Sequence, residues 1–405
     1  MKKIASKIRN TIEKYYIEFT IVIVVLFNLI KIIPGYLSLS DFWRSYILNY
    51  YVLSYQSAGR FISRGLVGTI TDLFTDSINS KIFYVVFWLL YFIIYTIIAI
   101  KIVRIAKNKS YNLIYLFLGT MILFSPAIMN YASDFARPDI FLVLLAYFSM
   151  FLIYKNRGLF LVPFLCVAGV LVHEGYICFF MPIIGIFFLN CIAEKKDIKR
   201  IVFFLISIVV CLLAVIVVFK YGKTNFDNID VLFQTIQNKI DIPLNSNMIN
   251  FEFGDMKADL GSISWGELST YTTWLELIFY ACIFLPIYFI YFKIMLNEIY
   301  RIKFGLIKLL YIIAPFSGLV MIFVGVDYGR WFSLSITACC IHLWFFVKWY
   351  NIDIIKSLKI QNDKKVIAIL GLISMGYLVV GPMGDIHEHF DFLVALNNFV
   401  TFFIY

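Results

Sequence analysis

Three short motifs in the sequence place an acidic residue three positions before an arginine: Asp41-Phe-Trp-Arg44, Asp134-Phe-Ala-Arg137 and Asp327-Tyr-Gly-Arg330. In a helix these two charges lie within one turn, so a local salt bridge at a helix end would explain any single copy. Each copy also stands at the edge of a long apolar stretch. Charges at membrane depth tend to face a bundle interior or a water-filled site, so three copies favour a shared polar cavity.

A second polar cluster interrupts the apolar segment LVHEGYICFFMP. His173 and Glu174 stand where this segment must turn back toward the membrane. They either cap the turn as a structural pair or act as acid and base, because histidine titrates near neutrality and a neighbouring carboxylate can hold it. Asp139 adds a carboxylate at the start of an apolar helix, where it compensates the helix dipole or joins the same cavity.

Arginines gather at the same boundaries, and they are Arg44, Arg60, Arg64, Arg137 and Arg330. Guanidinium groups suit bidentate contacts with phosphate oxygens, so these residues predict a binding site for a lipid-linked diphosphate. The acidic residues expected beside them in substrate binding are Asp41, Asp139 and Asp327. The candidates for a catalytic base are Glu174, His173 and Asp134. No metal-ligand spacing accompanies them, and we expect neither a metal nor another cofactor.

The elements that position these residues follow from the composition. Of the 405 residues, 62% are hydrophobic and 15% charged, and the mean hydropathy of +0.87 excludes a water-soluble protein. The apolar runs are continuous rather than alternating, which excludes a transmembrane barrel. The sequence therefore predicts an all-α polytopic integral membrane protein.

Apolar runs with charged ends predict eleven membrane helices, and the tail 392–405 is either a short twelfth crossing or an interfacial helix. The eleven lie near residues 17–36, 82–101, 111–129, 139–154, 159–172, 176–193, 201–219, 272–292, 306–326, 331–349 and 366–382.

The placement of basic residues predicts the orientation. With the N-terminus in the cytoplasm, 24 of the 35 Lys and Arg residues fall on the cytoplasmic side, as the positive-inside rule requires. The net charge of +10 is then explained by topology, so we expect the lipid bilayer and not nucleic acid as the surrounding partner. The motifs fall on the outer side.

The whole chain, 1–405, is predicted to form a single transmembrane helical domain, and two of its outer connections are long. The loop 37–81 is apolar enough to hold an interfacial or re-entrant helix, and the loop 221–271 holds a short helix in NIDVLFQTIQNKI. Aromatic residues at the outer boundaries, including Tyr50 and Tyr51, are expected in the interface belt, although sugar rings also stack on such side chains.

Three of these segments together resemble the bacterial membrane-integrated polysaccharide repeat-unit polymerases of the Wzy and EpsG-like type. They are the basic GRFISRGLVG, the arginine-bearing NYASDFARPDIFLVLLAYFSMFLIYK and the histidine-bearing LVPFLCVAGVLVHEGYICFFMP. The resemblance covers roughly residues 55–190, and DYGRW agrees loosely beyond it.

The resemblance implies an inverting, metal-independent enzyme that joins polyprenyl-diphosphate-linked oligosaccharide units at the outer face of the bacterial cytoplasmic membrane, in capsule, O-antigen or exopolysaccharide synthesis. A repeat-unit flippase and a chain-length regulator are the implied partners. Two other functions stay open. One is a GT-C-like glycosyltransferase that uses a polyprenyl-phosphate sugar with Asp41 as base. The other is a transporter or flippase, although the collection of polar groups toward one side favours an enzyme.

Overall fold

The computed structural model describes residues 41–107, 112–133, 136–222, 229–243, 266–303, 305–325, 327–360 and 364–380, together with Val22 and Leu26. This part of the chain consists of helices and contains no β-strand. The α-helices are α2 (Asp41–Val52), α3 (Leu66–Asp72), α4 (Ser80–Lys107), α5 (Asn112–Leu123), α6 (Pro126–Ser133), α7 (Asp139–Lys155), α8 (Leu161–Val172), α9 (Tyr176–Phe179), α10 (Met181–Lys195), α11 (Ile198–Tyr221), α12 (Ile229–Gln237), α15 (Tyr271–Glu298), α16 (Gly305–Ile313), α17 (Tyr328–Tyr350), α18 (Ile354–Leu358) and α19 (Lys364–Val380), with 3₁₀ helices η2 (Ile299–Arg301) and η3 (Ala314–Phe323).

Six segments of the described chain are long and apolar enough to cross a membrane. They are Ser80–Ile102, Tyr176–Lys195, Ile198–Tyr221, Tyr271–Arg301, Gly305–Phe323 and Tyr328–Tyr350. An all-α, multi-pass membrane protein is therefore the fold class, as the composition predicts. Of the predicted helix at 17–36 only Val22 and Leu26 are described, and the tail 392–405 lies outside the described residues, so the total of eleven or twelve crossings stays a prediction.

Three of the predicted helices are each divided in two, and a proline stands at every break. Pro126 begins α6, Pro182 is the second residue of α10, and Pro315 is the second residue of η3. Proline has no backbone N–H, so it interrupts a continuing helix but fits the first turn of a new one. The segments Tyr176–Lys195 and Gly305–Phe323 are nevertheless long and apolar enough to cross a membrane, so the predicted spans at 176–193 and 306–326 hold although the α-helix is interrupted.

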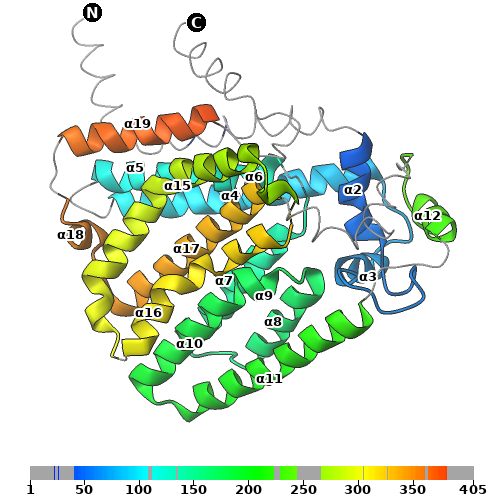
Figure 1. Cartoon of the computed structure of the whole chain (residues 1–405), viewed down its shortest axis with the longest axis horizontal. Helices are drawn as coiled ribbons and strands as arrows, with labels where there is room; N and C mark the ends of the chain where they lie inside the picture. Colours follow the sequence, from blue (N-terminus) through cyan, green and yellow to red (C-terminus); the bar gives the residue numbers. More distant parts are fainter. Residues whose placement is uncertain are drawn as a thin grey trace, which may run out of the picture. The chain divides into compact units, whose positions relative to one another are not determined.

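Internal contacts divide the chain into two compact units. The first comprises Met1–Ser38, Val85–Ser133 and Lys359–Tyr405, and in it α19 packs along α5 and contacts α6. The second comprises Leu39–Tyr84 and Asp134–Leu358. In this unit α8 packs against α7 and α11, and α17 packs against α7, α15 and η3 (Figure 1). All the predicted site residues belong to the second unit.

Helices of the second unit alternate in direction. α7 and α17 begin together, because Asp139 and Arg330 form an ion pair at their first turns. α11 runs the opposite way: the Arg200 Nη2 donates to the carbonyl of Ile153 near the end of α7 (3.3 Å). At the far end of α11, the carbonyl of Gly222 accepts from the N–H of Ser63 (3.2 Å). The predicted outer and cytoplasmic polar residues thus gather at opposite ends of this helix set.

The two long loops contact each other. In the first loop α2 and α3 are short helices, and in the second the predicted short helix is α12. The carbonyl of Lys239 accepts from the N–H of Ile78 (2.7 Å), and the Lys239 ammonium pairs with Asp72 at 2.8 Å. Asp241 accepts from the N–H of Ser80 (2.9 Å). The described parts of these loops therefore support each other beside the helix ends.

Impermeant thiol labelling in intact cells tests which end faces outward. Val231 in α12 is 58% exposed and Ile198 at the start of α11 is 73% exposed, so a cysteine at either position is accessible from its own side. In a background without the seven native cysteines, we expect Val231→Cys to label and Ile198→Cys to label only after the cells are permeabilised. The reverse pattern would place the motifs on the cytoplasmic side.

Candidate functional site

A buried arginine–aspartate pair joins the first turns of α7 and α17. The Arg330 guanidinium donates from Nε to Asp139 Oδ2 (2.5 Å) and from Nη2 to Oδ1 (2.6 Å). Arg330 is 8% exposed and Asp139 is 3% exposed. Two parallel charge-assisted bonds fix the relative position of both groups, and such a pair tolerates burial only when its hydrogen bonds are made.

Asp327 connects this pair to a second arginine. Its Oδ2 accepts from Arg137 Nη1 at 3.0 Å and from Arg330 Nη1 at 3.4 Å. The shorter bond therefore joins two different motifs, and the bond within the Asp327-to-Arg330 motif is the longer one. Arg137 is buried, while the Asp327 side chain is 29% exposed. Arg137 and Asp327 thus join two motifs that are far apart in the sequence, in addition to the local pair of Asp327 with Arg330.

A more exposed pair lies between the first long loop and the turn after α8. Arg64 donates from Nε to Glu174 Oε1 and Oε2 (3.2 and 3.1 Å) and from Nη2 to Oε1 (2.5 Å). The Arg64 Nη1 also lies 3.4 Å from the Tyr50 hydroxyl, which accepts its hydrogen bond. The side chains of Arg64 and Glu174 are 17% and 27% exposed. This pair is therefore the part of the site that a substrate can reach.

Two backbone conformations in the cluster are costly for side-chain-bearing residues. Arg64 has φ 63° and Ala136, directly before Arg137, has φ 67°. Both lie in the left-handed region, which costs on the order of 1–3 kcal/mol for residues other than glycine. The Tyr51 hydroxyl donates to the carbonyl of Ala136 and holds one of these turns in place. Left-handed residues that are not helix caps concentrate at functional sites, and here both carry the arginines into the cluster.

His173 is held in one neutral form. The backbone N–H of Gly175 donates to His173 Nδ1 (3.0 Å), so the ring proton sits on Nε2. Burial, reinforced by the positive charge of Arg64 and opposed by Glu174, lowers the pKa of His173 to about 3. His173 Nδ1 lies 3.9 Å from Glu174 Oε2. At neutral pH this histidine is a hydrogen-bond donor through Nε2. Of the two neighbouring candidates for a catalytic base, Glu174 is therefore the better one.

The low pKa of His173 predicts a pH dependence of stability. The unfolded chain takes up a proton near pH 6.5, whereas the folded chain does so only near pH 3. The free energy of unfolding therefore falls as pH decreases through this window, by up to about 1.4 kcal/mol per pH unit. In thermal unfolding of detergent-solubilised protein, we expect wild type to lose more stability than His173→Gln between pH 7 and pH 5. Equal losses would show that this histidine does not titrate differently on folding.

The remaining predicted residues are placed as follows. Arg60 is exposed on the loop before Arg64. The backbones of Asp41 and Arg44 lie in α2, their side chains are not among those described, and Asp134 lies outside the described residues. Sequence reasoning missed the Gly175 N–H as a partner of His173. It also assigned Tyr50 and Tyr51 to the interface belt, whereas both are buried and contact the site.

The described site is balanced in charge. Three arginines, Arg64, Arg137 and Arg330, face three carboxylates, Glu174, Asp139 and Asp327. The expected cationic pocket also included Arg44 and Arg60, so its net charge stays a prediction, while the charges of the described ion pairs cancel. The geometry instead gives a buried, fixed half around Arg330 and an accessible half around Arg64 and Glu174. An anion that binds Arg64 would release Glu174 from its pairing.

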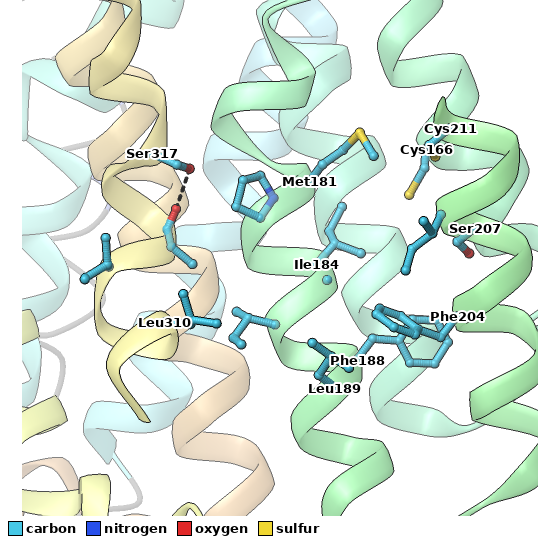
Figure 2. A pocket seen from close by; sticks show the side chains of 16 residues that line it. Cys166, Met181, Ile184, Phe188, Leu189, Phe204, Ser207, Cys211, Leu310 and Ser317 are labelled. Carbon is cyan, nitrogen blue, oxygen red and sulfur yellow. Dashed lines mark hydrogen bonds between the residues drawn. The ribbon is translucent and has the colours of Figure 1, made fainter. Parts of the chain in front are cut away.

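An apolar cavity of about 440 Å³ lies in the same unit and is lined mainly by residues of α10, α11 and α16. Figure 2 shows its lining from Met181 and Ile184 of α10, Phe204 and Cys211 of α11, and Leu310 of α16. The Ser317 hydroxyl at its edge donates to the carbonyl of Cys178 (2.6 Å), which belongs to the turn of helix directly after Glu174. The cavity suits a hydrocarbon chain in its chemistry.

No protein-family model, curated protein or solved structure matches the chain.

Proposed function

We propose that the chain is a polymerase that joins polyprenyl-diphosphate-linked oligosaccharide repeat units at the outer face of a bacterial cytoplasmic membrane. The observation that carries the proposal is the accessible pair of Arg64 and Glu174 at one end of the helix set. It supplies the two groups that glycosyl transfer from a diphosphate requires, a cation for the leaving group and a carboxylate for the acceptor hydroxyl.

In the proposed reaction the acceptor hydroxyl oxygen attacks the anomeric carbon of the donor sugar. The bond from that carbon to the diphosphate oxygen breaks, and polyprenyl diphosphate leaves with the electron pair. Glu174 accepts the proton of the hydroxyl, and Arg64 binds the departing phosphate oxygens in bidentate fashion. Attack from the face opposite the leaving group inverts the anomeric centre. Binding of the diphosphate to Arg64 and release of Glu174 are then one event, so the base becomes available only with a donor in place.

The buried half of the site supports this step without contacting the proton. Two ion pairs hold the first turns of α7 and α17 beside the turn that carries Glu174. They join Arg330 to Asp139 and Arg137 to Asp327. Preorganised charges of this kind lower the reorganisation needed when the diphosphate leaves. His173 Nε2–H adds a donor beside Glu174 for a substrate oxygen.

The lipid part of the substrate needs an apolar surface near the reacting groups. The cavity along α10 and α11 begins one helical turn beyond the segment of Glu174 and is lined almost wholly by apolar side chains. A polyprenyl chain that enters from the bilayer can occupy it while the diphosphate stays at the helix end.

Purified protein and chemically defined polyprenyl-diphosphate oligosaccharide test the proposal directly. We expect a series of polymers of increasing length. One molecule of polyprenyl diphosphate should be released for each glycosidic bond formed. Transfer only from a polyprenyl-monophosphate sugar would support the alternative glycosyltransferase. Movement of the intact lipid-linked unit across a vesicle membrane, without any new linkage, would support the flippase.

A further inference from the structure

A second polar cavity, of about 540 Å³, opens at the other end of the same helices. Lysines from the last turns of three helices line it: Lys155 of α7, Lys195 of α10 and Lys348 of α17. The only carboxylate in its lining is that of Glu194. The charged groups of the lining thus sum to a positive excess, in contrast to the balanced site at the opposite end.

The three ammonium groups lie over aromatic rings rather than against carboxylates. The Nζ of Lys195 is 4.6 Å from the centre of the Trp349 ring, that of Lys155 is 5.3 Å from Tyr154, and that of Lys348 is 4.9 Å from Trp344. No described carboxylate lies within salt-bridge distance of any of the three. Glu194 is itself engaged, with Lys303 at 3.7 Å and the Tyr350 hydroxyl at 3.3 Å. Aromatic faces hold a cation without neutralising it, so the positive charge stays available to an anion.

A buried arginine lies next to this cavity. Arg200 is 1% exposed, and its guanidinium carbon lies 5.3 Å from the centre of the same Trp349 ring. Its Nη2 donates to the carbonyl of Ile153, but Nε and Nη1 have no hydrogen-bond partner among the described residues. An unpartnered buried guanidinium nitrogen is costly. An anion in the neighbouring cavity would compensate this charge.

Compensation of helix ends alone does not require this arrangement. α7, α10 and α17 each finish with a left-handed residue, Asn156, Lys196 and Asn351, whose backbone N–H bonds to carbonyls of the last turn. One or two carbonyls of each last turn thus have a backbone donor, so the helix ends are capped without the lysine side chains. Three lysines and three aromatic side chains, those of Tyr154, Trp349 and Tyr350, line the cavity, and a buried arginine lies beside it. Such a hollow suits a compact anion.

We propose that this cavity binds a phosphate group at the membrane surface, that of an anionic phospholipid headgroup or of a soluble phosphate ester. Basic pockets between membrane helices recognise lipid phosphates in this way. The site lies at the end where the sequence predicts the cytoplasmic leaflet. It is distinct from the Arg64 and Glu174 pair. Its test does not depend on whether the chain is a polymerase.

Native mass spectrometry of the detergent-solubilised full chain, titrated with phosphatidylglycerol or with phosphatidylcholine, tests the site. We expect a saturable phosphatidylglycerol adduct that phosphatidylcholine does not form. The triple variant Lys155→Gln, Lys195→Gln, Lys348→Gln should weaken it by roughly fivefold for each lysine removed. Glu194→Gln should strengthen it, because the one opposing charge is lost. Lys220→Gln is the matched control, since Lys220 also lies over a ring, that of Tyr221 at 5.2 Å, but at the other end of α11.

Competition with inorganic phosphate distinguishes the two sources. If millimolar phosphate displaces phosphatidylglycerol in wild type and Glu194→Gln but acts more weakly in the triple variant, the site is confirmed and accepts a soluble phosphate. If phosphate does not compete and the lipid ranking holds, the site is a headgroup site. Equal lipid binding by wild type and the triple variant, or an equal loss in the Lys220→Gln control, would overturn the proposal.

Discussion

Replacing Glu174 with glutamine is expected to reduce polymer formation by roughly 10²–10⁴-fold, the usual contribution of a general base. Glutamine keeps the size of the side chain and can still accept a hydrogen bond from Arg64, so the turn after α8 should keep its conformation. What it cannot do is take the proton of the acceptor hydroxyl. Single lipid-linked repeat units should accumulate, and the amount of protein in the membrane should stay normal.

Arg64→Lys should also lower the rate, because lysine keeps the charge but loses the bidentate contact with phosphate oxygens. The double variant Arg64→Lys, Glu174→Gln should form polymer at nearly the same rate as Glu174→Gln alone if the two residues act as one unit in the same step. Asp230→Asn is the matched control, since that exposed carboxylate of α12 belongs to none of the ion pairs of the described site. Normal polymer from Glu174→Gln in a defined assay would make the pair structural, and Asp134 and Asp41 would be the next candidate bases.

The positions of the helices were predictable because apolar runs and charged ends are properties of the sequence alone. The start of α7 at Asp139 and the short α12 in the second loop are observed where expected. A proline stands at each break, but Pro286 lies inside the continuous helix α15, so proline alone did not predict where a helix is divided. The apolar run at 306–326 also gave no sign that its second half would be the 3₁₀ helix η3, since hydropathy measures composition and not helical pitch.

The candidate site was predictable in its residue types but not in its pairing. The sequence marks Arg330 and Asp327 as neighbours within one turn, yet Arg330 pairs more closely with Asp139, and Asp327 also pairs with Arg137. Arg64 forms an ion pair with Glu174 although the two residues are far apart in the sequence. Such pairings depend on which helices become neighbours, and periodicity within one helix cannot show that. The left-handed turns at Arg64 and Ala136 are likewise hidden, because neither residue is glycine or asparagine.

The largest effect on stability is expected from breaking the pair between Asp139 and Arg330. Asp139→Asn removes the charge but keeps the shape, and it leaves a guanidinium that is 8% exposed without its closest counter-charge. Removing one partner of a buried ion pair costs about 3–5 kcal/mol. We expect a marked fall in unfolding temperature in detergent and a lower yield from the membrane.

A second variant distinguishes the cost of an uncompensated charge on Arg330 from the cost of losing its contact with Asp139. Asp139→Leu combined with Arg330→Met replaces both charges with apolar side chains, and such replacements are often neutral or stabilising. The double variant should therefore recover most of the unfolding temperature lost by Asp139→Asn, while polymer formation stays low because Asp327 no longer has Arg330 beside it. Recovery of both stability and polymer would show that the buried half of the site contributes packing alone. An Asp139→Asn protein as stable as wild type would instead mean that Asp327 alone compensates Arg330 in the folded chain.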